Sequence, residues 1–172
     1  MTAFTDRIVF LDVESVCLDP APGSIWEVAV MLATDDTPRV VQVRPDLSIA
    51  VPEALVVGRF AERYRADEAI RFVDCWLVDN MPEKGAVIVG SNPQFDIAHM
   101  DAQWGLDQPA PWHYHPCDLP SLVAGATGLW PESDGSLSLS WAAETVGLDP
   151  ADYETHTAAG DVLLARDIWE CR

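Results

Sequence analysis

The sequence predicts an α/β fold with a mixed sheet, and three observations predict it. Residues 7–13 form a largely apolar run of strand length, which is typical of a central strand covered on both faces. Further strand patterns at 25–33 and 39–43 follow, the last two separated by a polar turn, so the three are expected to form an antiparallel meander. Helical and strand patterns then alternate, which indicates strands of both directions in one sheet.

The elements after the meander follow from spacing. Apolar residues recur at helical intervals in 67–81, and a short apolar strand is expected directly after it at 86–89. The rest of the chain predicts a helix at 93–104, a strand at 112–117, and helices at 119–126, 137–146 and 157–169.

Length and composition predict a single domain over residues 1–172. Of its 172 residues, 49% are apolar, which is enough to bury a core without disulfides or a structural metal. No apolar stretch approaches membrane-spanning length and the first residues do not resemble a signal peptide, so we expect a cytoplasmic protein that does not bind membranes. The cysteines lack metal-binding spacing and are expected to be buried or partly buried thiols: Cys17, Cys75, Cys117 and Cys171.

The chain is strongly acidic. Ten Lys and Arg face 28 Asp and Glu, a formal charge of −18, which argues against tight binding of duplex nucleic acid. The charge is less unfavourable for an enzyme that holds one strand end through divalent cations, because bound cations invert the sign of an acidic pocket. Four arginines between residues 58 and 71 could contact a phosphate backbone or solvate a helix, and the second interpretation is favoured: Arg59, Arg63, Arg65 and Arg71.

The first acidic motif lies at the end of the predicted central strand. Residues two apart in a strand share a face, so Asp12 and Glu14 are expected to project to the same side. Two like charges at the end of a buried strand are costly unless a cation lies between them. Taken alone, the motif is better explained as an ordinary polar strand end.

The second motif opens the helix predicted at 93–104. Pro93 suits the first helical position, which places Asp96 about one turn into the helix. Stabilisation of the helix dipole would be a sufficient role for this acid in isolation. The helix follows the strand at 86–89, however, and that strand is expected beside the first one, which would bring Asp96 to the same sheet edge.

The third motif contains a histidine and an acid five residues apart. That interval is about 500° of helical rotation, so His156 and Asp161 cannot share a helix face, and the histidine is expected on the loop before the helix. Asp161 lies on the apolar stripe of Leu164 and Ile168, where an acid needs a partner, although acids are also favoured in first turns generally. Gly160 is expected to let the helix approach the first strand closely.

In this order and separation, the three motifs resemble those of the DEDD superfamily of 3′-to-5′ exonucleases, in the histidine-bearing DEDDh branch. That branch includes the proofreading subunit of bacterial DNA polymerase III, RNase T and oligoribonuclease. The resemblance extends over residues 7–169, and the segment 137–149 is similar to the helix and Gly-Leu turn that precede the third motif in the family. It implies a ribonuclease H-like fold, with a mixed five-stranded sheet and helices on both faces.

The resemblance also implies a role for each motif residue. Asp12, Glu14 and Asp161 would bind a first Mg²⁺ or Mn²⁺, Asp12 would bridge to a second ion, and Asp96 would support both, partly through water. His156 would be the general base that deprotonates the attacking water. The chemistry agrees, because carboxylate oxygens suit these ions, two ions can stabilise both oxygens of a displacement, and imidazole suits proton transfer near neutral pH.

The predicted function is therefore a metal-dependent 3′-to-5′ exonuclease that releases nucleoside 5′-monophosphates from a single-stranded DNA or RNA 3′ end. One alternative is an oligoribonuclease-type enzyme of the same fold, and others are an acidic DNA-mimic interaction protein or a weakly active subunit of a replication complex. No motif chooses between DNA and RNA, or indicates a replication partner or a homodimer. The remaining histidines are expected to be packed or hydrogen-bonded rather than ligands: His99, His113 and His115.

Overall fold

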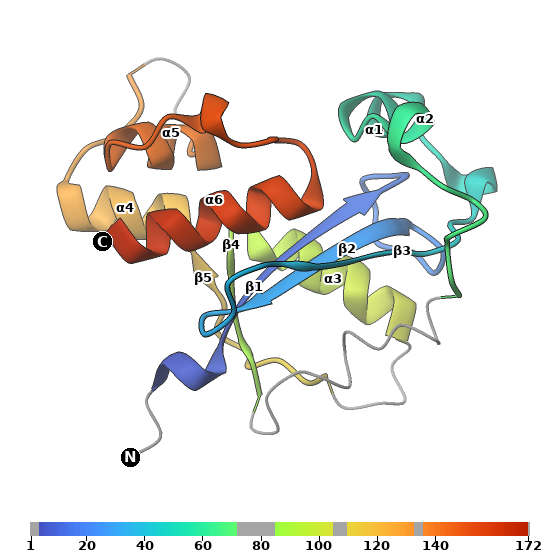
Figure 1. Cartoon of the computed structure of the whole chain (residues 1–172), viewed down its shortest axis with the longest axis horizontal. Coiled ribbons are helices and arrows are strands. Elements are labelled where there is room, and N and C mark those ends of the chain that lie inside the picture. The colour runs from blue at the N-terminus through green and yellow to red at the C-terminus, as the bar shows by residue number, and fades with distance from the viewer. Residues whose placement is uncertain (1–3, 72–84, 105–109, 133–135, 172) are drawn as a thin grey trace.

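The structure is a computed structural model that describes residues 4–71, 85–104, 110–132 and 136–171, and a mixed five-stranded sheet forms its centre (Figure 1). The strand order is β3-β2-β1-β4-β5, in which β1, β2 and β3 are antiparallel and β4 and β5 run parallel to β1. This confirms the predicted meander and the α/β, ribonuclease H-like fold. The strands are β1 (Ile8–Ser15), β2 (Ile25–Leu32), β3 (Arg39–Gln42), β4 (Val87–Gly90) and β5 (Cys117–Asp118).

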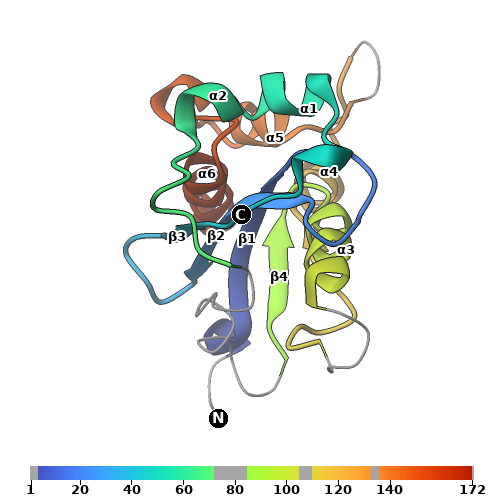
Figure 2. The same ribbon diagram turned by 90° about the vertical axis from the view of Figure 1, so that its right-hand side faces the viewer.

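Helices cover both faces of the sheet, as predicted. In Figure 2, α6 and α3 lie on opposite sides of the strands. Short 3₁₀ helices occur at Phe4–Arg7, Leu47–Ile49 and Pro150–Asp152. The α-helices are α1 (Pro52–Val57), α2 (Phe60–Arg63), α3 (Pro93–Trp104), α4 (Leu119–Thr127), α5 (Leu139–Thr145) and α6 (Ala158–Cys171).

The alternation of side chains along β1 divides the core into two clusters. Ile8 and Phe10 pack with residues of α4, α5 and α6, whereas Val9 and Leu11 pack on the other face against α3. All four side chains are almost completely buried, which explains why the sequence of this strand shows no polar alternation. By the same period of two, Asp12 continues the face that α6 covers.

A third apolar cluster attaches α1 and α2 beyond the end of β1. Trp26 of β2 is fully buried, and Phe60 meets its ring edge-on at 5.3 Å between centroids. Tyr64 stacks on Phe60 at 4.6 Å and completes the cluster. The sequence pattern predicts neither helix. Helices of six and four residues are too short to show an apolar period.

Two predicted elements differ in the structure. The strand expected at 112–117 is reduced to Cys117–Asp118 and one isolated bridge between Trp112 and Ala86. Residues 67–71 form a turn and a bridge from Ile70 to Val43 rather than the start of a helix, and the rest of that predicted helix lies outside the described residues. Over a few residues, the spacing of apolar side chains does not separate a helix from a short extended segment, which explains this error.

The cysteine prediction holds in part. Cys17 is buried and Cys117 is half-buried, but Cys171 is exposed at the end of α6, so the expectation was wrong there, and Cys75 lies outside the described residues. None of the helices in the described part of the chain has both the length and the apolar composition that crossing a membrane requires.

Candidate metal and catalytic site

The first two motifs are joined by a hydrogen bond where β4 ends. β4 pairs with β1 as far as the Phe10–Val89 pair, whereas β1 continues to Ser15. Beyond that point the N–H of Val13 donates to Oδ1 of Asp96 at 2.9 Å. Asp96, in the first turn of α3, is only 3% exposed. The carboxylate thus takes the place of the missing strand partner.

Electrostatics show that the motif acids share one small region. Burial raises the pKa of Asp12 well above its usual value, and the nearby carboxylates of Asp96, Asp161 and Glu14 raise it further. Burial likewise raises the pKa of Glu14 to about 8, that of Asp96 to about 7 and that of Asp161 to about 6. These acids repel one another and lie largely away from bulk water, an arrangement typical of functional sites.

The third motif reaches this region through the loop before α6. His156 has a left-handed backbone with φ of 59°, and its N–H donates to Oδ2 of Asp161 at 3.2 Å. As expected, the histidine precedes the helix, which starts at Ala158, and it is exposed. The bond to its N–H and attraction to His156 both lower the pKa of Asp161 and oppose part of the effect of burial.

Gly160 lies against the loop that precedes α6. A Cβ at this position would lie 2.0 Å from the carbonyl oxygen of Glu154 and 2.9 Å from Oγ1 of Thr157. Thr157 Oγ1 in turn donates to the Glu154 carbonyl at 2.6 Å. The absent side chain therefore makes room for the loop that carries His156.

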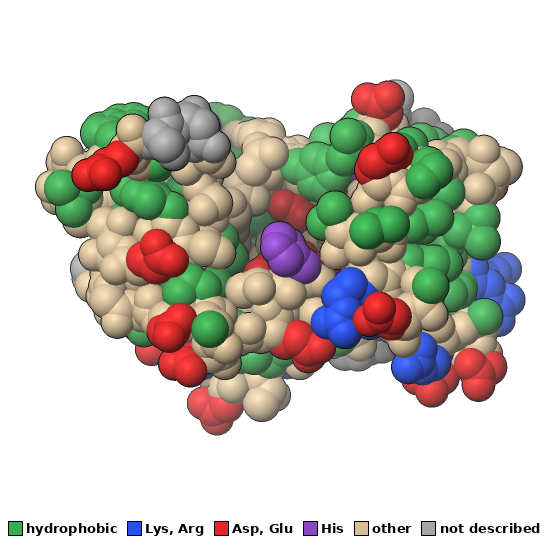
Figure 3. All heavy atoms as spheres, turned by 90° about the horizontal axis from the view of Figure 1, so that it is seen from above, with side chains coloured by type: hydrophobic (Ala, Val, Ile, Leu, Met, Phe, Trp, Pro, Cys, Tyr) green, Lys and Arg blue, Asp and Glu red, His purple; other side chains and the backbone are tan. Residues whose placement is uncertain are grey.

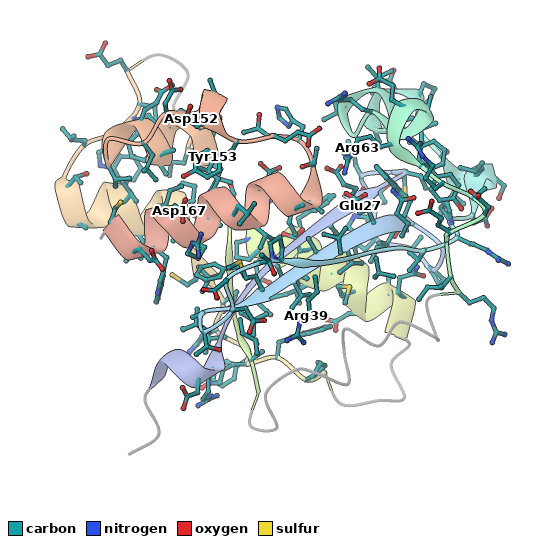
Figure 4. All side chains as sticks on the ribbon, in the orientation of Figure 1. Glu27, Arg39, Arg63, Asp152, Tyr153 and Asp167 are labelled. Atoms are coloured by element: carbon teal, nitrogen blue, oxygen red, sulfur yellow. The ribbon has the colours of Figure 1, made fainter. Side chains whose placement is uncertain are left out.

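Arg63 is the residue of this region that the sequence analysis missed. Its guanidinium forms an ion pair with Glu27 and approaches Glu14 Oε1 to 3.5 Å, and its side chain is 15% exposed (Figure 4). It also donates to the carbonyl oxygens of Gly58 at 3.1 Å and His156 at 3.2 Å. The expectation that the arginines of 58–71 merely solvate a surface is therefore wrong for Arg63.

A weak signal for this arginine was present in the strand at 25–33. Glu27 stands between Trp26 and Val28, and all three are buried in the structure. A buried carboxylate requires a cation or several donors. The sequence thus indicated that a cation was needed, but could not say which of the arginines supplied it.

A groove opens beside the acids. It has a volume of about 350 Å³ and its lining includes Glu14, Leu18, Val57 and Phe95. Figure 3 shows this side of the molecule as a hollow with acidic side chains at the bottom, a histidine at the rim and apolar side chains over α1. Leu18 and Val57 are both more than half exposed, so apolar surface is available next to the carboxylates.

The donor set fits a divalent cation by its chemistry. Asp12, Glu14, Asp96 and Asp161 are hard oxygen donors in mutual repulsion, and Mg²⁺ or Mn²⁺ would relieve that repulsion. Within the described ranges, however, no group of three or more Asp, Glu, His or Cys side chains lies in an arrangement that could hold a metal ion as it stands. Arg63 supplies a positive charge to Glu14 in this arrangement.

No known protein-family profile matches this sequence, and no curated protein matches it either. The fold, however, matches solved structures. The zinc-bound Escherichia coli exonuclease I complex with single-stranded DNA superimposes with a TM-score of 0.74 at 18% identity, over 95% of this chain and 39% of the other.

The fold is shared with exonuclease I. The apo form gives a TM-score of 0.70 at 19% identity, over 95% of this chain and 41% of the other, and a product-bound form gives 0.63 at 19% identity, over 95% and 42%. The chain therefore spans about two fifths of the length of these exonuclease I chains. At identities this low, the structural likeness establishes a common fold and nothing further.

Proposed function

We propose that this chain is a metal-dependent 3′-to-5′ exonuclease that releases nucleoside 5′-monophosphates from single-stranded ends. The observation that carries the proposal is the convergence of the three motifs: Asp96 is bonded to the backbone of Val13, and Asp12 lies in the field of Asp96 and Asp161. The shared fold supports it, because exonuclease I has been solved in complex with single-stranded oligonucleotides such as dT13.

Each motif residue has a role in this proposal. Asp12, Glu14 and Asp161 bind Mg²⁺ or Mn²⁺, and Asp96 supports the ions while its bond to Val13 fixes its orientation. Two such ions would stabilise the attacking and leaving oxygens of the displacement. His156 takes the proton from the attacking water, and its exposed loop position lets the imidazole approach from the open side of the site.

The groove next to the acids would hold the 3′-terminal nucleotide. Phe95 and Val57 offer apolar faces to its base, and Glu14 lines the same groove, so the adjoining phosphate would lie at the carboxylates. Contacts to one terminal nucleotide need little long-range attraction, which suits a chain with a net charge of −18.

A hydrolysis assay tests the proposal directly. Single-stranded DNA, single-stranded RNA and dinucleotides with a 5′ label are incubated with Mg²⁺, Mn²⁺ or EDTA, and products are resolved by length. We expect stepwise shortening from the 3′ end with either ion and none in EDTA. Asp12→Ala abolishes it, whereas Glu170→Ala, an exposed acid near the end of α6, leaves it unchanged. The absence of hydrolysis under all metal conditions would overturn the proposal.

The same assay separates the alternatives. Preference for RNA dinucleotides would identify an oligoribonuclease-type enzyme. An acidic DNA mimic predicts acids arrayed on an exposed face and no metal dependence, whereas Glu14, Asp96 and Asp161 are largely buried around one region. Burial of these charges favours the enzyme.

A further inference from the structure

A second hollow adjoins the first turn of α3. This cavity of about 420 Å³ is lined in part by Asn92, Gln94, Tyr114 and Asp118. Gln94 and Phe95 are neighbours in the chain, yet Gln94 lines this cavity and Phe95 lines the groove beside the acids. The next residue, Asp96, is bonded to Val13. The first turn of α3 therefore lines both hollows and also carries the acid that is bonded to β1.

An irregular edge strand builds the outer wall of this cavity. Ala86 pairs with Trp112 and Val89 pairs with Cys117, so two residues of the β4 side, 87 and 88, face four on the edge side, 113–116. The edge side therefore has two extra residues between the two pairings, which is a bulge. Such bulges occur at sheet edges and beside active sites, where they redirect a side chain.

The side chain displayed by the bulge is Tyr114. It is 78% exposed, and its ring stacks on His113 with 4.4 Å between centroids and 28° between planes. The centroid of the His115 ring lies 4.1 Å from that of Tyr114, with the two planes tilted by 50°, and His115 also lines the cavity. Three adjacent aromatic rings at the surface thus form a platform, which we call the 113–115 platform.

The inner wall is fixed by hydrogen bonds. Asn92 has a left-handed backbone with φ of 50°, and its N–H donates to Oδ1 of Asp118 at 2.7 Å. The other oxygen of Asp118 accepts the N–H of Ser121 at 3.1 Å and so caps α4. The start of α3 and the start of α4 are therefore held together across the bottom of the cavity.

We propose that this cavity binds a nucleobase of the single strand upstream of the scissile phosphate, stacked on the 113–115 platform. The inference rests on the proposed exonuclease function. If the terminal nucleotide occupies the groove at Phe95 and its phosphate the acids, the upstream nucleotides can pass over the first turn of α3 to the cavity at Gln94. Side-chain amides at Asn92 and Gln94 can hydrogen-bond to base edges.

The charge of the chain makes such a site useful. A protein at −18 gains little from long-range attraction to phosphates, whereas base stacking on aromatic rings requires no positive charge and tolerates any sequence. The platform would therefore supply affinity that Lys and Arg supply in other nucleases. The competing explanation is that the bulge only protects the edge of the sheet from pairing with another chain.

The test compares a substrate that reaches the cavity with one that does not. Oligo(dT) of eight nucleotides extends upstream, whereas the p-nitrophenyl ester of thymidine 5′-monophosphate has no upstream base. We expect Tyr114→Ala to raise KM for the oligonucleotide about 5- to 150-fold, the loss of one base stack, and to leave hydrolysis of the ester unchanged. Tyr114→Phe keeps the ring and the wild-type KM, and Trp130→Ala, an exposed aromatic elsewhere, serves as the matched control.

The outcomes separate this inference from the proposed function. If Tyr114→Ala slows hydrolysis of both substrates equally, or of neither, the proposed role of the 113–115 platform is overturned. The exonuclease proposal stands in both cases. If the wild-type protein hydrolyses neither substrate, the proposed exonuclease function is overturned. In that event, photo-crosslinking in EDTA with 5-iodouracil placed at single positions of the oligonucleotide still decides the platform: we expect a crosslink to Tyr114 from one upstream position, and crosslinks only elsewhere, or none, would contradict it.

Discussion

Val13 donates its backbone N–H to the carboxylate of Asp96, and this one bond joins the first motif to the second. Because an asparagine oxygen can accept the same bond, Asp96→Asn separates the charge from the structural contact. We expect Asp96→Asn to keep or raise the stability of the metal-free protein while activity or metal affinity falls about 10- to 100-fold. Urea unfolding in EDTA and an exonuclease assay measure the two effects.

Asp96→Ala is the matched variant that removes both. It leaves the buried N–H of Val13 without an acceptor, which should lower the free energy of unfolding by about 1–3 kcal/mol. Equal stability of Asp96→Ala and Asp96→Asn would show that the bond to Val13 is not structural.

Stability in the absence of metal should depend on pH in an unusual direction. The pKa of Glu14 is raised to about 8, that of Asp96 to about 7 and that of Asp161 to about 6, so the folded state retains protons that the unfolded chain releases near pH 4. Raised acid pKa values give stability that is present at low pH and lost as pH rises through them. Thermal unfolding in EDTA should therefore show Tm falling between about pH 5 and pH 8.

Metal and charge removal provide the controls for this pH effect. Mn²⁺ binds only the folded site and should raise Tm more at pH 8, where the carboxylates are ionised, than at pH 5. Asp12→Asn, which removes one charge that its neighbours feel, should flatten the decline in EDTA. A Tm that rises with pH in EDTA across this window would contradict the site electrostatics.

Arg63 should contribute far more to the free energy of unfolding than Arg59. Arg63→Met leaves the carboxylate of Glu27, 5% exposed, without its cation, and removal of one partner of a buried pair costs about 3–5 kcal/mol. Arg59 and Glu62 are exposed, so Arg59→Met should change unfolding free energy by about 1 kcal/mol or less. Chemical denaturation of the two variants makes the comparison.

A double variant separates stability from positioning. Arg63→Met with Glu27→Leu replaces the ion pair by apolar side chains and should recover most of the stability. Activity should stay low, because the carbonyl of His156 still lacks the donor that Arg63 provides. Full recovery of activity in the double variant would show that Arg63 has only a structural role.

Apolar runs and the order of the motifs predict most of the fold. The features that they do not predict depend on contacts between residues far apart in the sequence. The strands at 8–15 and 25–32 are buried on both faces, so their composition alone identifies them. Arg63 is 36 residues from Glu27 and 93 from His156, and no local pattern encodes such pairs. The sequence favours a surface position for its side chain, because a cluster of charged residues shows where arginines occur in the chain but not which residues they contact.

The edge of the sheet shows the same limit. Spacing predicted one strand at 112–117, but the register that splits it into a bridge at Trp112 and β5 at Cys117 is set by β4. For the site, order and spacing led us to expect that the acids converge, and the structure places Asp12 in the field of Asp96 and Asp161. Their roles as metal ligands stay a prediction that the variants above test.

Loss of the imidazole should slow hydrolysis without releasing metal. His156 has φ of 59°, a conformation that asparagine tolerates better than alanine, so His156→Asn is the cleaner variant. We expect kcat to fall about 10²- to 10⁴-fold, as for loss of a general base, with Mn²⁺ affinity by calorimetry nearly unchanged. Asp161→Ala should instead weaken Mn²⁺ binding. A similar loss of metal affinity in both variants would contradict the role given to His156.

A pair of glycines tests whether the loop before α6 positions the histidine. A Cβ at Gly160 would lie 2.0 Å from the carbonyl oxygen of Glu154, so Gly160→Ala must displace backbone and should cost about 1–3 kcal/mol or more. Gly125 in α4 has open space around the same atom, and Gly125→Ala should stabilise the protein by about 0.5–1 kcal/mol through helix propensity. Because the displaced segment carries His156, Gly160→Ala should also lower kcat at temperatures where the protein remains folded. Circular dichroism melts and single-turnover hydrolysis measure both quantities, and a Gly160→Ala protein with normal kcat would show that the position of this loop does not govern catalysis.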